Sequence, residues 1–268
     1  MIKSTLLLTI VSVVLLPVSP IYAFAGNVQD YPDFRFDGSG GMRLIAQAEE
    51  VDDEFFFPED LEEEQEIYRI SDPLRPFNVA MFHFNDKLYF WILKPVAKGW
   101  RAVVPDPART GMKNFFYNLT MPIRFVNSLL QLKGQKAAAE LGRFAFNTSL
   151  GVLGFANPAK DFENLNPEPE DLGQTLGRYN IGHGFYLFLP VIGPSSARDA
   201  VGKVGDSFLD PVRYVDPWEL RSGAQGVDAV NNTSFRIGDY ETLKEAAINP
   251  YDAIKNAYIQ RRLRSVEN

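Results

Sequence analysis

The sequence predicts an all-α fold for the chain from residue 71 onward. Apolar residues recur there at spacings of three and four, the period of an α-helix, rather than at the spacing of two that a half-buried strand requires. Residues that typically begin or end helices separate these segments. Strand-like runs such as residues 186–192 are short and isolated, and one strand cannot form a sheet.

The first predicted helix covers residues 76–97 and carries one wide apolar face. Asp72 and Pro73 precede it, where a helix would begin, and it is expected to close near Gly99. None of the side chains on this face can act as a nucleophile or form a metal cluster, so the helix is suited to binding apolar matter. Its apolar positions are Phe77, Ala80, Met81, Phe84, Leu88, Trp91 and Ile92.

Three shorter helices are predicted to follow. Asp106 is expected to cap the second helix, with Pro107 in its first position, and residues 118–122 break it. The third helix covers residues 123–132. The fourth covers residues 135–150 and places small and apolar side chains on one side.

The chain changes character after the fourth helix. Residues 151–158 form an apolar, glycine-rich loop, which is costly to expose unless it is buried or meets lipid. Residues 172–194 hold seven glycines and prolines that weaken helices. A helix is predicted to start at Ser195, and a long helix to cover residues 217–247. A final helix is expected after Pro250.

The composition excludes several classes of protein. A chain of 268 residues with 46% hydrophobic residues can bury a substantial core, which excludes disorder throughout. The formal net charge of −7 argues against a nucleic-acid partner, because neutralising phosphates requires a basic stripe. The chain contains no cysteine, so no disulfide stabilises it.

Residues 1–25 have the layout of a secretory signal peptide. Lys3 precedes an apolar run over residues 6–16, and Ala23-Phe24-Ala25 provides small residues at the cleavage positions. We expect cleavage after Ala25, with Ala23 as the alternative, and export of the protein. The competing interpretation is a retained membrane anchor, although the run is too short to span a bilayer stably.

Residues 26–70 are expected to form an acidic, disordered tail. From Glu49 to Glu66, 11 of 18 side chains are acidic, and such a density of like charge disfavours a packed core. The alternative is that Phe55-Phe56-Phe57, which is framed by carboxylates, docks onto a partner. The helical domain then covers residues 71–262, and residues 263–268 form the C-terminal end.

Few residues could carry catalysis or hold a metal. His83 and His183 are far apart in the sequence, and neither has a carboxylate at metal-ligand spacing, so no metal or cofactor is expected. Ser149 lies in a segment that lacks the first glycine and the preceding strand of a nucleophile elbow. We therefore do not expect an enzyme. A hydrolase that uses Ser149 stays as an alternative.

Three basic residues stand among small and apolar neighbours: Arg143, Arg198 and Lys203. A cation in such surroundings is costly unless it is paired or faces a polar ligand such as a phosphate. One interpretation is therefore ion pairing, and the other is contact with a phosphorylated head group. The acidic residues available for pairing are Glu140, Asp199 and Asp206.

Six motifs follow one another along residues 70–262. They are Asp72-Pro73-Leu74-Arg75-Pro76-Phe77-Asn78 with Phe82-x-Phe84-Asn85; Lys94-Pro95-Val96-Ala97-x-Gly99-x-Arg101-x-Val103-Val104-Pro105; Asn114-Phe115-Phe116-x-Asn118-Leu119; Gly142-Arg143-Phe144-x-x-Asn147-Thr148-x-x-Gly151; Gly173-Gln174-Thr175-Leu176-Gly177; and Leu189-Pro190-x-x-Gly193-Pro194-Ser195-Ser196-x-Arg198-Asp199. In order and spacing, this set resembles the MlaA (VacJ) family of outer-membrane lipoproteins.

The resemblance implies an all-α, ring-shaped arrangement of amphipathic helices that lies in the inner leaflet of a Gram-negative outer membrane and has a central pore. Members of the family pass mislocalised phospholipids from the outer leaflet to a soluble periplasmic carrier, MlaC, and associate with trimeric porins. The resemblance implies no covalent chemistry and no cofactor.

Residue type, together with the resemblance, suggests roles for ten residues. Residues 151–158 fall where the family has a mobile hairpin beside the pore. We expect one group to support the ring, a second to meet or gate acyl chains, and a third to favour phosphate head groups. These groups are Phe77, Asn78, Phe82 and Phe84; Val152, Leu153 and Phe155; and Arg143, Arg198 and Lys203.

The chain departs from the family in one respect. Typical members carry a lipobox cysteine that is acylated, and this sequence has none. We therefore expect an exported protein on the periplasmic face of the outer membrane, held there by its amphipathic ring and its porin partner. The main alternative is a periplasmic helical scaffold that binds protein partners and carries no lipid.

Overall fold

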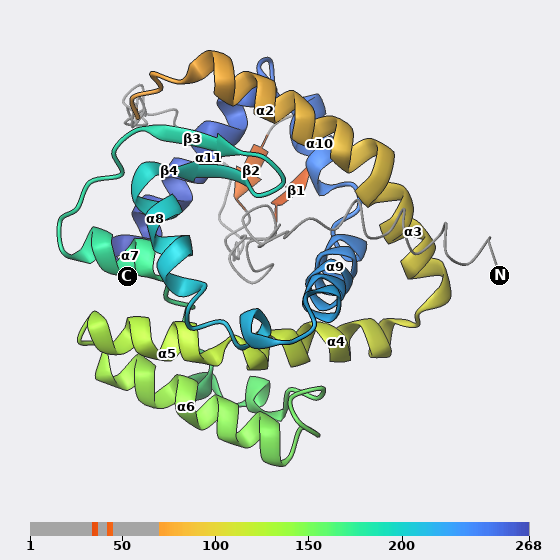
Figure 1. The fold of residues 1–268 in the computed structure, drawn as a ribbon, viewed down its shortest axis with the longest axis vertical. Helices are drawn as coiled ribbons and strands as arrows, with labels where there is room; N and C mark the ends of the chain where they lie inside the picture. The colour runs from red at the N-terminus through yellow and green to blue at the C-terminus, as the bar shows by residue number, and fades with distance from the viewer. Residues whose placement is uncertain (1–33, 37–41, 45–69, 268) are drawn as a thin grey trace, which may run out of the picture.

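The computed structural model describes residues 34–36, 42–44 and 70–267, and these form a largely helical ring (Figure 1). The predicted signal peptide lies outside the described residues. Of the predicted acidic tail, the structure describes strands β1 (Phe34–Phe36) and β2 (Met42–Leu44), which pair antiparallel, and Ile70 at its end. The all-α fold class is confirmed.

The first predicted helix is a longer rod than expected. It consists of α2 (Arg75–Leu88), a π-helical turn η3 (Tyr89–Leu93) and α3 (Lys94–Val103). Pro95 has no N–H to donate, so regular α-helical hydrogen bonding is interrupted near it. The π turn bridges this interruption, with the Lys94 N–H donating to the carbonyl of Tyr89. The rod therefore continues past Gly99, where it was expected to close.

The next three helices lie where the spacing predicted them, within two residues at each end. They are α4 (Asp106–Leu119), α5 (Met121–Leu130) and α6 (Gly134–Ser149). The predicted cap of α4 is wrong. Pro105 is the N-cap residue, while Asp106 lies in the first turn and pairs with Arg109 one turn later.

The segment from 158 to 196 contains elements that the sequence did not predict. Two short 3-10 turns, η4 (Pro158–Asp161) and η5 (Glu163–Leu165), precede helix α7 (Leu172–Arg178). Asp171 caps α7 by accepting a hydrogen bond from the Gln174 N–H at 2.8 Å. This cap and the packing of α7 on α8 stabilise a helix that contains two glycines.

A β-hairpin follows α7 and corrects the expectation that no sheet forms. Strand β3 (Tyr186–Leu189) pairs antiparallel with β4 (Gly193–Ser196), with Leu189 opposite Gly193. The partner strand escaped detection because its sequence, Gly-Pro-Ser-Ser, lacks strand-forming residues. The hairpin packs against α2.

The C-terminal part consists of α8 (Ala197–Asp206), the 3-10 turn η6 (Pro211–Tyr214), α9 (Trp218–Ser234), α10 (Asp239–Ala246) and α11 (Pro250–Glu267). The single helix predicted over residues 217–247 is wrong. The chain turns at Gly238, whose φ of 111° is accessible to glycine and strained for other residues, and α10 starts there as a separate helix.

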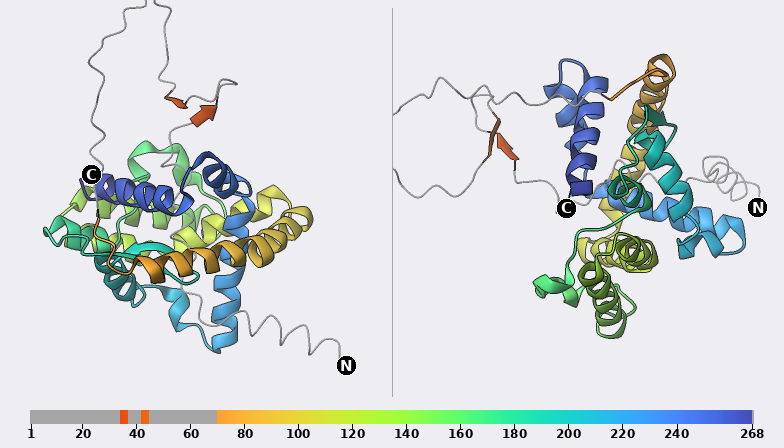
Figure 2. Two further views of the ribbon diagram at one scale, coloured as in Figure 1. Left: turned by 90° about the horizontal axis from the view of Figure 1, so that it is seen from above. Right: turned by 90° about the vertical axis from the view of Figure 1, so that its left-hand side faces the viewer.

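The elements close into a ring when viewed down the short axis (Figure 1). The α2–η3–α3 rod forms one arc, α4 and α5 form the opposite arc, and α7, α8 and the β3–β4 hairpin complete the circle. Helix α9 lies inside the α3 arc, and α6 packs outside α5. Edge-on views place α11 on one face of the ring, while η6 and the start of α9 project from the other (Figure 2).

The apolar core is small and mostly aromatic. It lies where α2, the hairpin and α11 meet, and includes Phe82, Tyr186, Phe188, Tyr251 and Tyr258. The Phe82 and Phe188 rings make an edge-to-face contact with centroids 5.8 Å apart. Among the described residues, no helix is both long and apolar enough to cross a bilayer.

Candidate functional site

The ring buries polar side chains and exposes apolar ones. Among the described residues, 24 buried residues are polar or charged and 14 are hydrophobic, while 30 large hydrophobic residues are exposed. Soluble proteins usually show the opposite preference for burial, and extended exposed apolar surface marks a site for lipid or protein contact. The buried polar groups and the exposed apolar surface together define the candidate site.

Helix α8 illustrates this inverted pattern. Its buried residues are Arg198, Asp199, Gly202 and Asp206, all on the side that faces α7 and α11. Its opposite face exposes Val201 and Val204, and the exposed Phe208, two residues after the helix ends, continues their three-and-four spacing. These three side chains are 56% to 64% exposed, and Arg213 lies over the Phe208 ring.

A charged network ties α8 to α7 and α11. Arg262 donates from Nε to Asp199 at 2.9 Å and from Nη1 to Asp171 at 2.6 Å. The Tyr258 hydroxyl also donates to Asp199. Burial alone would raise the pKa of Asp199, but the Arg262 guanidinium and the Tyr258 hydroxyl hold it below its usual range. The sequence offered no direct indication of this network, because its members lie 59 to 91 residues apart.

A second buried network joins α5, α7 and α8. Asn127 donates to Asp206 at 2.8 Å and accepts from the Thr175 hydroxyl at 2.9 Å. The Leu172 N–H also donates to Asp206 at 3.0 Å. Burial raises the pKa of Asp206 to about 6, because no cation pairs with this carboxylate among the described residues.

Helices α7 and α8 approach closely through glycines. A Cβ added to Gly202 would lie 2.5 Å from the backbone nitrogen of Gly173. A Cβ on Gly205 would lie 2.3 Å from the Leu172 side chain. Gly202 and Gly205 therefore allow α8 to lie close to a neighbouring helix of the same chain.

The three predicted head-group residues lie in different surroundings. Arg198 is buried and pairs with Asp199, its Nε 3.0 Å from Oδ1. Lys203 makes no ion pair among the described residues and donates to the Ser195 hydroxyl at 3.3 Å. Burial and the nearby Arg262 lower the pKa of Lys203 to about 8. Arg143 belongs to a separate part of the ring, in α6.

Arg143 does not pair with Glu140, which was one of its expected partners. Glu140 is 1% exposed and accepts hydrogen bonds at 2.9 Å from Arg124 of α5 instead. Arg143 is 7% exposed and lies over the Tyr117 ring, 4.5 Å from its centroid. The sequence analysis missed Arg124, which also lies over that ring at 3.8 Å.

The four residues expected to support the ring divide into two inward and two outward side chains. Asn78 is fully buried, donates to the Tyr186 carbonyl at 3.0 Å and accepts from the Phe188 N–H at 2.8 Å. Asn78 thus ties α2 to the hairpin, and Phe82 belongs to the aromatic core. Phe77 and Phe84 are about half exposed on α2.

The loop after α6 presents apolar side chains in a strained conformation. Val152 and Leu153 are largely exposed and have φ values of 51° and 57°. Left-handed backbone is unfavourable for branched residues, and such strain concentrates at functional sites. Phe155 anchors the loop by stacking on Phe115 of α4, with ring centroids 4.8 Å apart.

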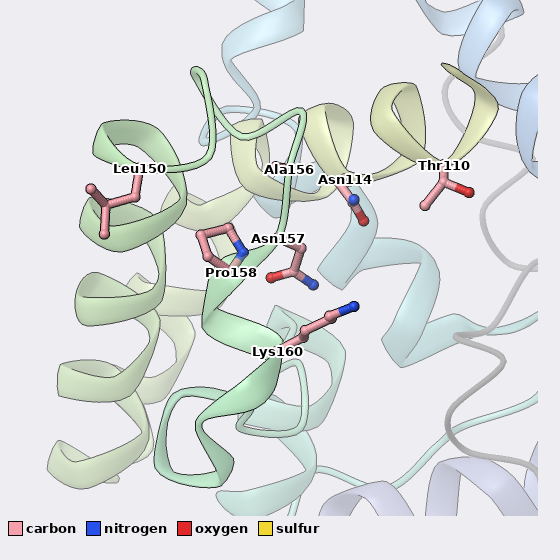
Figure 3. Close-up of a pocket in the computed structure, with 7 residues that line it drawn as sticks. All are labelled: Thr110, Asn114, Leu150, Ala156, Asn157, Pro158 and Lys160. Carbon is pink, nitrogen blue, oxygen red and sulfur yellow. The ribbon is translucent and has the colours of Figure 1, made fainter. Parts of the chain in front are cut away.

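A pocket of about 350 Å³ lies behind this loop (Figure 3). Its wall is formed by α4 on one side and by the loop and η4 on the other. Lys160 lines it and makes no ion pair among the described residues. The lining combines apolar and polar side chains with one cation. The lining residues are Thr110, Asn114, Leu150, Ala156, Asn157, Pro158 and Lys160.

Ser149 and the candidate metal ligands were the other residues considered from the sequence. Ser149 is exposed at the end of α6, not on a strand-to-helix turn. No group of three or more His, Asp or Glu side chains in this part is arranged to hold a metal ion.

Comparisons with known proteins agree with the fold and with the motifs. A family model described as MlaA lipoprotein matches residues 70–265. The chain is 36% identical over 197 residues to the intermembrane phospholipid transport system lipoprotein MlaA of Escherichia coli (strain K12), covering 71% of this chain and 76% of that protein. The protein of the same name from Haemophilus influenzae is 32% identical over 201 residues, covering 73% and 79%.

One similar protein and one similar structure extend this comparison. An uncharacterized protein of Rickettsia bellii is 29% identical over 223 residues, covering 83% of this chain and 87% of that protein. A solved structure, described by the words "Structural basis for maintenance of bacterial outer membrane lipid asymmetry", is 35% identical, with a TM-score of 0.65. It covers 73% of this chain and 99% of its own.

Proposed function

Because this chain belongs to the MlaA lipoprotein family, we propose that it acts in intermembrane phospholipid transport at the outer membrane. In this proposal it removes mislocalised phospholipids from the outer leaflet and passes them to a soluble periplasmic carrier similar to MlaC. It acts by binding and release rather than as an enzyme. The transport maintains the lipid asymmetry of the outer membrane.

The observation that carries the proposal is the inverted burial pattern of the ring. The hydrogen-bonded polar groups between α5, α7, α8 and α11 hold the ring together from within. The helices can therefore present apolar stripes outward, as on α8, without losing their packing. Such a surface is costly in water and favourable against acyl chains or an apolar protein partner.

We assign three roles to the residues of the site. Phe77, Asn78, Phe82 and Phe84 support the ring around a central pore, and Asn78 does so through its bonds to the hairpin. Val152, Leu153 and Phe155 meet or gate acyl chains beside the pocket that Lys160 lines. Arg143, Arg198 and Lys203 favour phosphate head groups, although Asp199 already neutralises Arg198.

The proposed location is the periplasmic face of the outer membrane, in contact with a porin trimer. The sequence offers no cysteine for acylation. We therefore assign membrane attachment to the exposed apolar side chains, which contribute about 1.5 to 3 kcal/mol each when they are fully buried. Trp91 and Val103 on the outer rod and Leu132 after α5 are largely exposed and available for this contact.

Deleting the gene in its native host tests the proposal. Phospholipid is expected to accumulate in the outer leaflet, where an externally added phospholipase can reach it, and the intact gene is expected to reverse the effect. A variant with Val152→Ser and Leu153→Ser is expected to be present in the outer-membrane fraction and to restore asymmetry poorly. Unchanged outer-leaflet phospholipid in the deletion strain would contradict transport and favour a protein-binding scaffold.

A further inference from the structure

Arg143 is a buried cation without a counter-charge. Its side chain is 93% buried, and its Nε atom has no hydrogen-bond partner among the described residues. Among the described residues, no carboxylate forms an ion pair with Arg143. Its guanidinium group instead makes a cation–π contact with the Tyr117 ring, 4.5 Å from the ring centroid. A ring face offsets only part of the cost of taking a guanidinium out of water.

The buried side chains around Arg143 carry a net positive charge. Glu140 is the buried carboxylate of α6, and both of its oxygens accept from the Nε of Arg124 at 2.9 Å. Arg124 also donates from Nη1 to the Thr120 hydroxyl at 3.0 Å. Two guanidinium groups therefore lie over one Tyr117 ring, and Glu140 pairs with Arg124 alone, so the charge of Arg143 has no counter-charge among the described residues.

We propose that Arg143 binds the phosphate of a phospholipid and that this site favours head groups with a net negative charge. The inference rests on the proposed function and adds a lipid selectivity to it. A guanidinium can donate two parallel hydrogen bonds to phosphate oxygens, which supplies the missing counter-charge. The ammonium group of a zwitterionic head group needs an acceptor, and Glu140 is already engaged by Arg124.

The other two basic residues differ from Arg143 in their partners, although the Nη2 atom of Arg198 also lacks a hydrogen bond and Lys203 also lacks an ion pair among the described residues. Arg198 is neutralised by Asp199, which also accepts from Arg262. The Lys203 ammonium donates to the Ser195 hydroxyl, and burial lowers its pKa, which weakens it as a permanent cation. The structure thus assigns head-group selectivity to Arg143 rather than to all three residues.

The test measures which lipid the full chain retains. The purified chain is incubated in detergent with equal amounts of phosphatidylglycerol and phosphatidylethanolamine and re-isolated, and the bound lipids are quantified by mass spectrometry. The wild type is expected to retain about tenfold more phosphatidylglycerol, the factor lost when the ammonium of phosphatidylethanolamine leaves one hydrogen bond unmade. Arg143→Gln is expected to bring the ratio close to one.

Two further variants test whether the lipid preference depends on the positive charge at position 143. Arg101→Gln removes an exposed arginine of α3 that has no ion pair among the described residues, and it is expected to keep the wild-type ratio. Arg143→Lys keeps the charge and is expected to keep the ratio well above one, so it remains informative if the glutamine variant folds poorly. The melting temperature of each variant is recorded alongside.

The possible outcomes separate this inference from the proposed function. Equal retention of the two lipids by the wild type would overturn the inference and leave lipid binding intact. Enrichment that survives Arg143→Gln, or is lost in Arg143→Lys, would also overturn it. Abolition of the enrichment by an equal concentration of inorganic phosphate would assign the site to free phosphate instead. A wild type that retains no phospholipid would contradict both the inference and the proposed function.

Discussion

Arg262 of α11 and Asp199 of α8 are joined by two hydrogen bonds, from Nε at 2.9 Å and from Nη2 at 3.0 Å, although 63 residues separate them. Both side chains are buried. The same guanidinium reaches Asp171 before α7. One arginine therefore connects three elements on one side of the ring, and the apolar stripe of α8 can face outward because its opposite side is fixed in this way.

Replacing Arg262 tests this connection. Arg262→Gln removes the cation shared by the partly exposed Asp171 and the buried Asp199, and leaves Arg198 as the ion-pair partner of Asp199. Breaking a buried pair in this manner typically lowers the free energy of unfolding by about 3 to 5 kcal/mol. The matched control is Arg264→Gln, which changes an exposed arginine of the same helix. Thermal melting of the two variants measures the difference, and equal melting temperatures would show that the network does not hold the ring.

Asp206 predicts a dependence of stability on pH. Its pKa is about 6 in the folded chain, against 3.8 for an ordinary aspartate, so the folded state binds more protons than the unfolded state between these values. The contribution of Asp206 to stability is therefore fully present below pH 4 and is lost as the pH rises through 6. The change amounts to about 2 to 3 kcal/mol for a shift of this size.

Asp206→Asn removes this titration and keeps a side-chain oxygen for the Leu172 N–H. The wild type is expected to lose stability relative to this variant between pH 4.5 and pH 7.5, as measured by urea unfolding at each pH. The control is Asp161→Asn, which changes an exposed carboxylate of η4. A constant difference between wild type and Asp206→Asn across this range would refute the assignment.

Replacement by alanine is expected to have opposite effects at two helical glycines, Gly202 of α8 and Gly99 of α3. Gly202→Ala forces a methyl group against the Gly173 backbone, and such overpacking is expected to lower the free energy of unfolding by about 1 to 3 kcal/mol. Gly99→Ala lies in α3 with open space around the new methyl group, and it is expected to raise that free energy by up to about 1 kcal/mol. Chemical denaturation measures the free energy of unfolding of both variants. An unchanged value for Gly202→Ala would mean that α7 and α8 lie further apart than the structure shows.

A polar substitution at Val152, in the loop after α6, is expected to stabilise the fold and to slow phospholipid transfer. Asparagine adopts φ values near 51° more readily than valine, so Val152→Asn is expected to raise the free energy of unfolding by about 1 kcal/mol. It is also expected to slow phospholipid transfer, because a polar side chain replaces an acyl-chain contact. The control is Val227→Asn, an exposed valine of α9 to which no lipid contact is assigned. Faster or unchanged transfer in Val152→Asn would argue against a role for this loop in lipid contact.

The sequence predicted most helices because their apolar positions follow the helical period, as on the first predicted helix. It did not predict the break at Gly238 or the π turn at residues 89–93. The periodicity on both sides of each feature continues with little change, and the break depends on the backbone conformation of one glycine. The β4 strand was missed because its pairing with β3, not its own residues, stabilises it.

The interior of the site was less predictable than its surface. Arg143, Arg198 and Lys203 stand out in the sequence as cations among apolar neighbours, but their partners do not. Glu140 lies three residues before Arg143 and pairs instead with Arg124, 16 residues away. Long-range pairings of this kind depend on how the helices cross, and a single sequence does not specify the crossings.

Lipid analysis of the purified chain tests the central claim most directly. The full chain is extracted from the outer-membrane fraction in mild detergent, its fold is verified by circular dichroism, and its organic extract is examined by mass spectrometry. A ring that buries polar groups and presents apolar side chains to lipid is expected to carry glycerophospholipid. A folded chain that is absent from that fraction, or that carries no glycerophospholipid, would contradict the account.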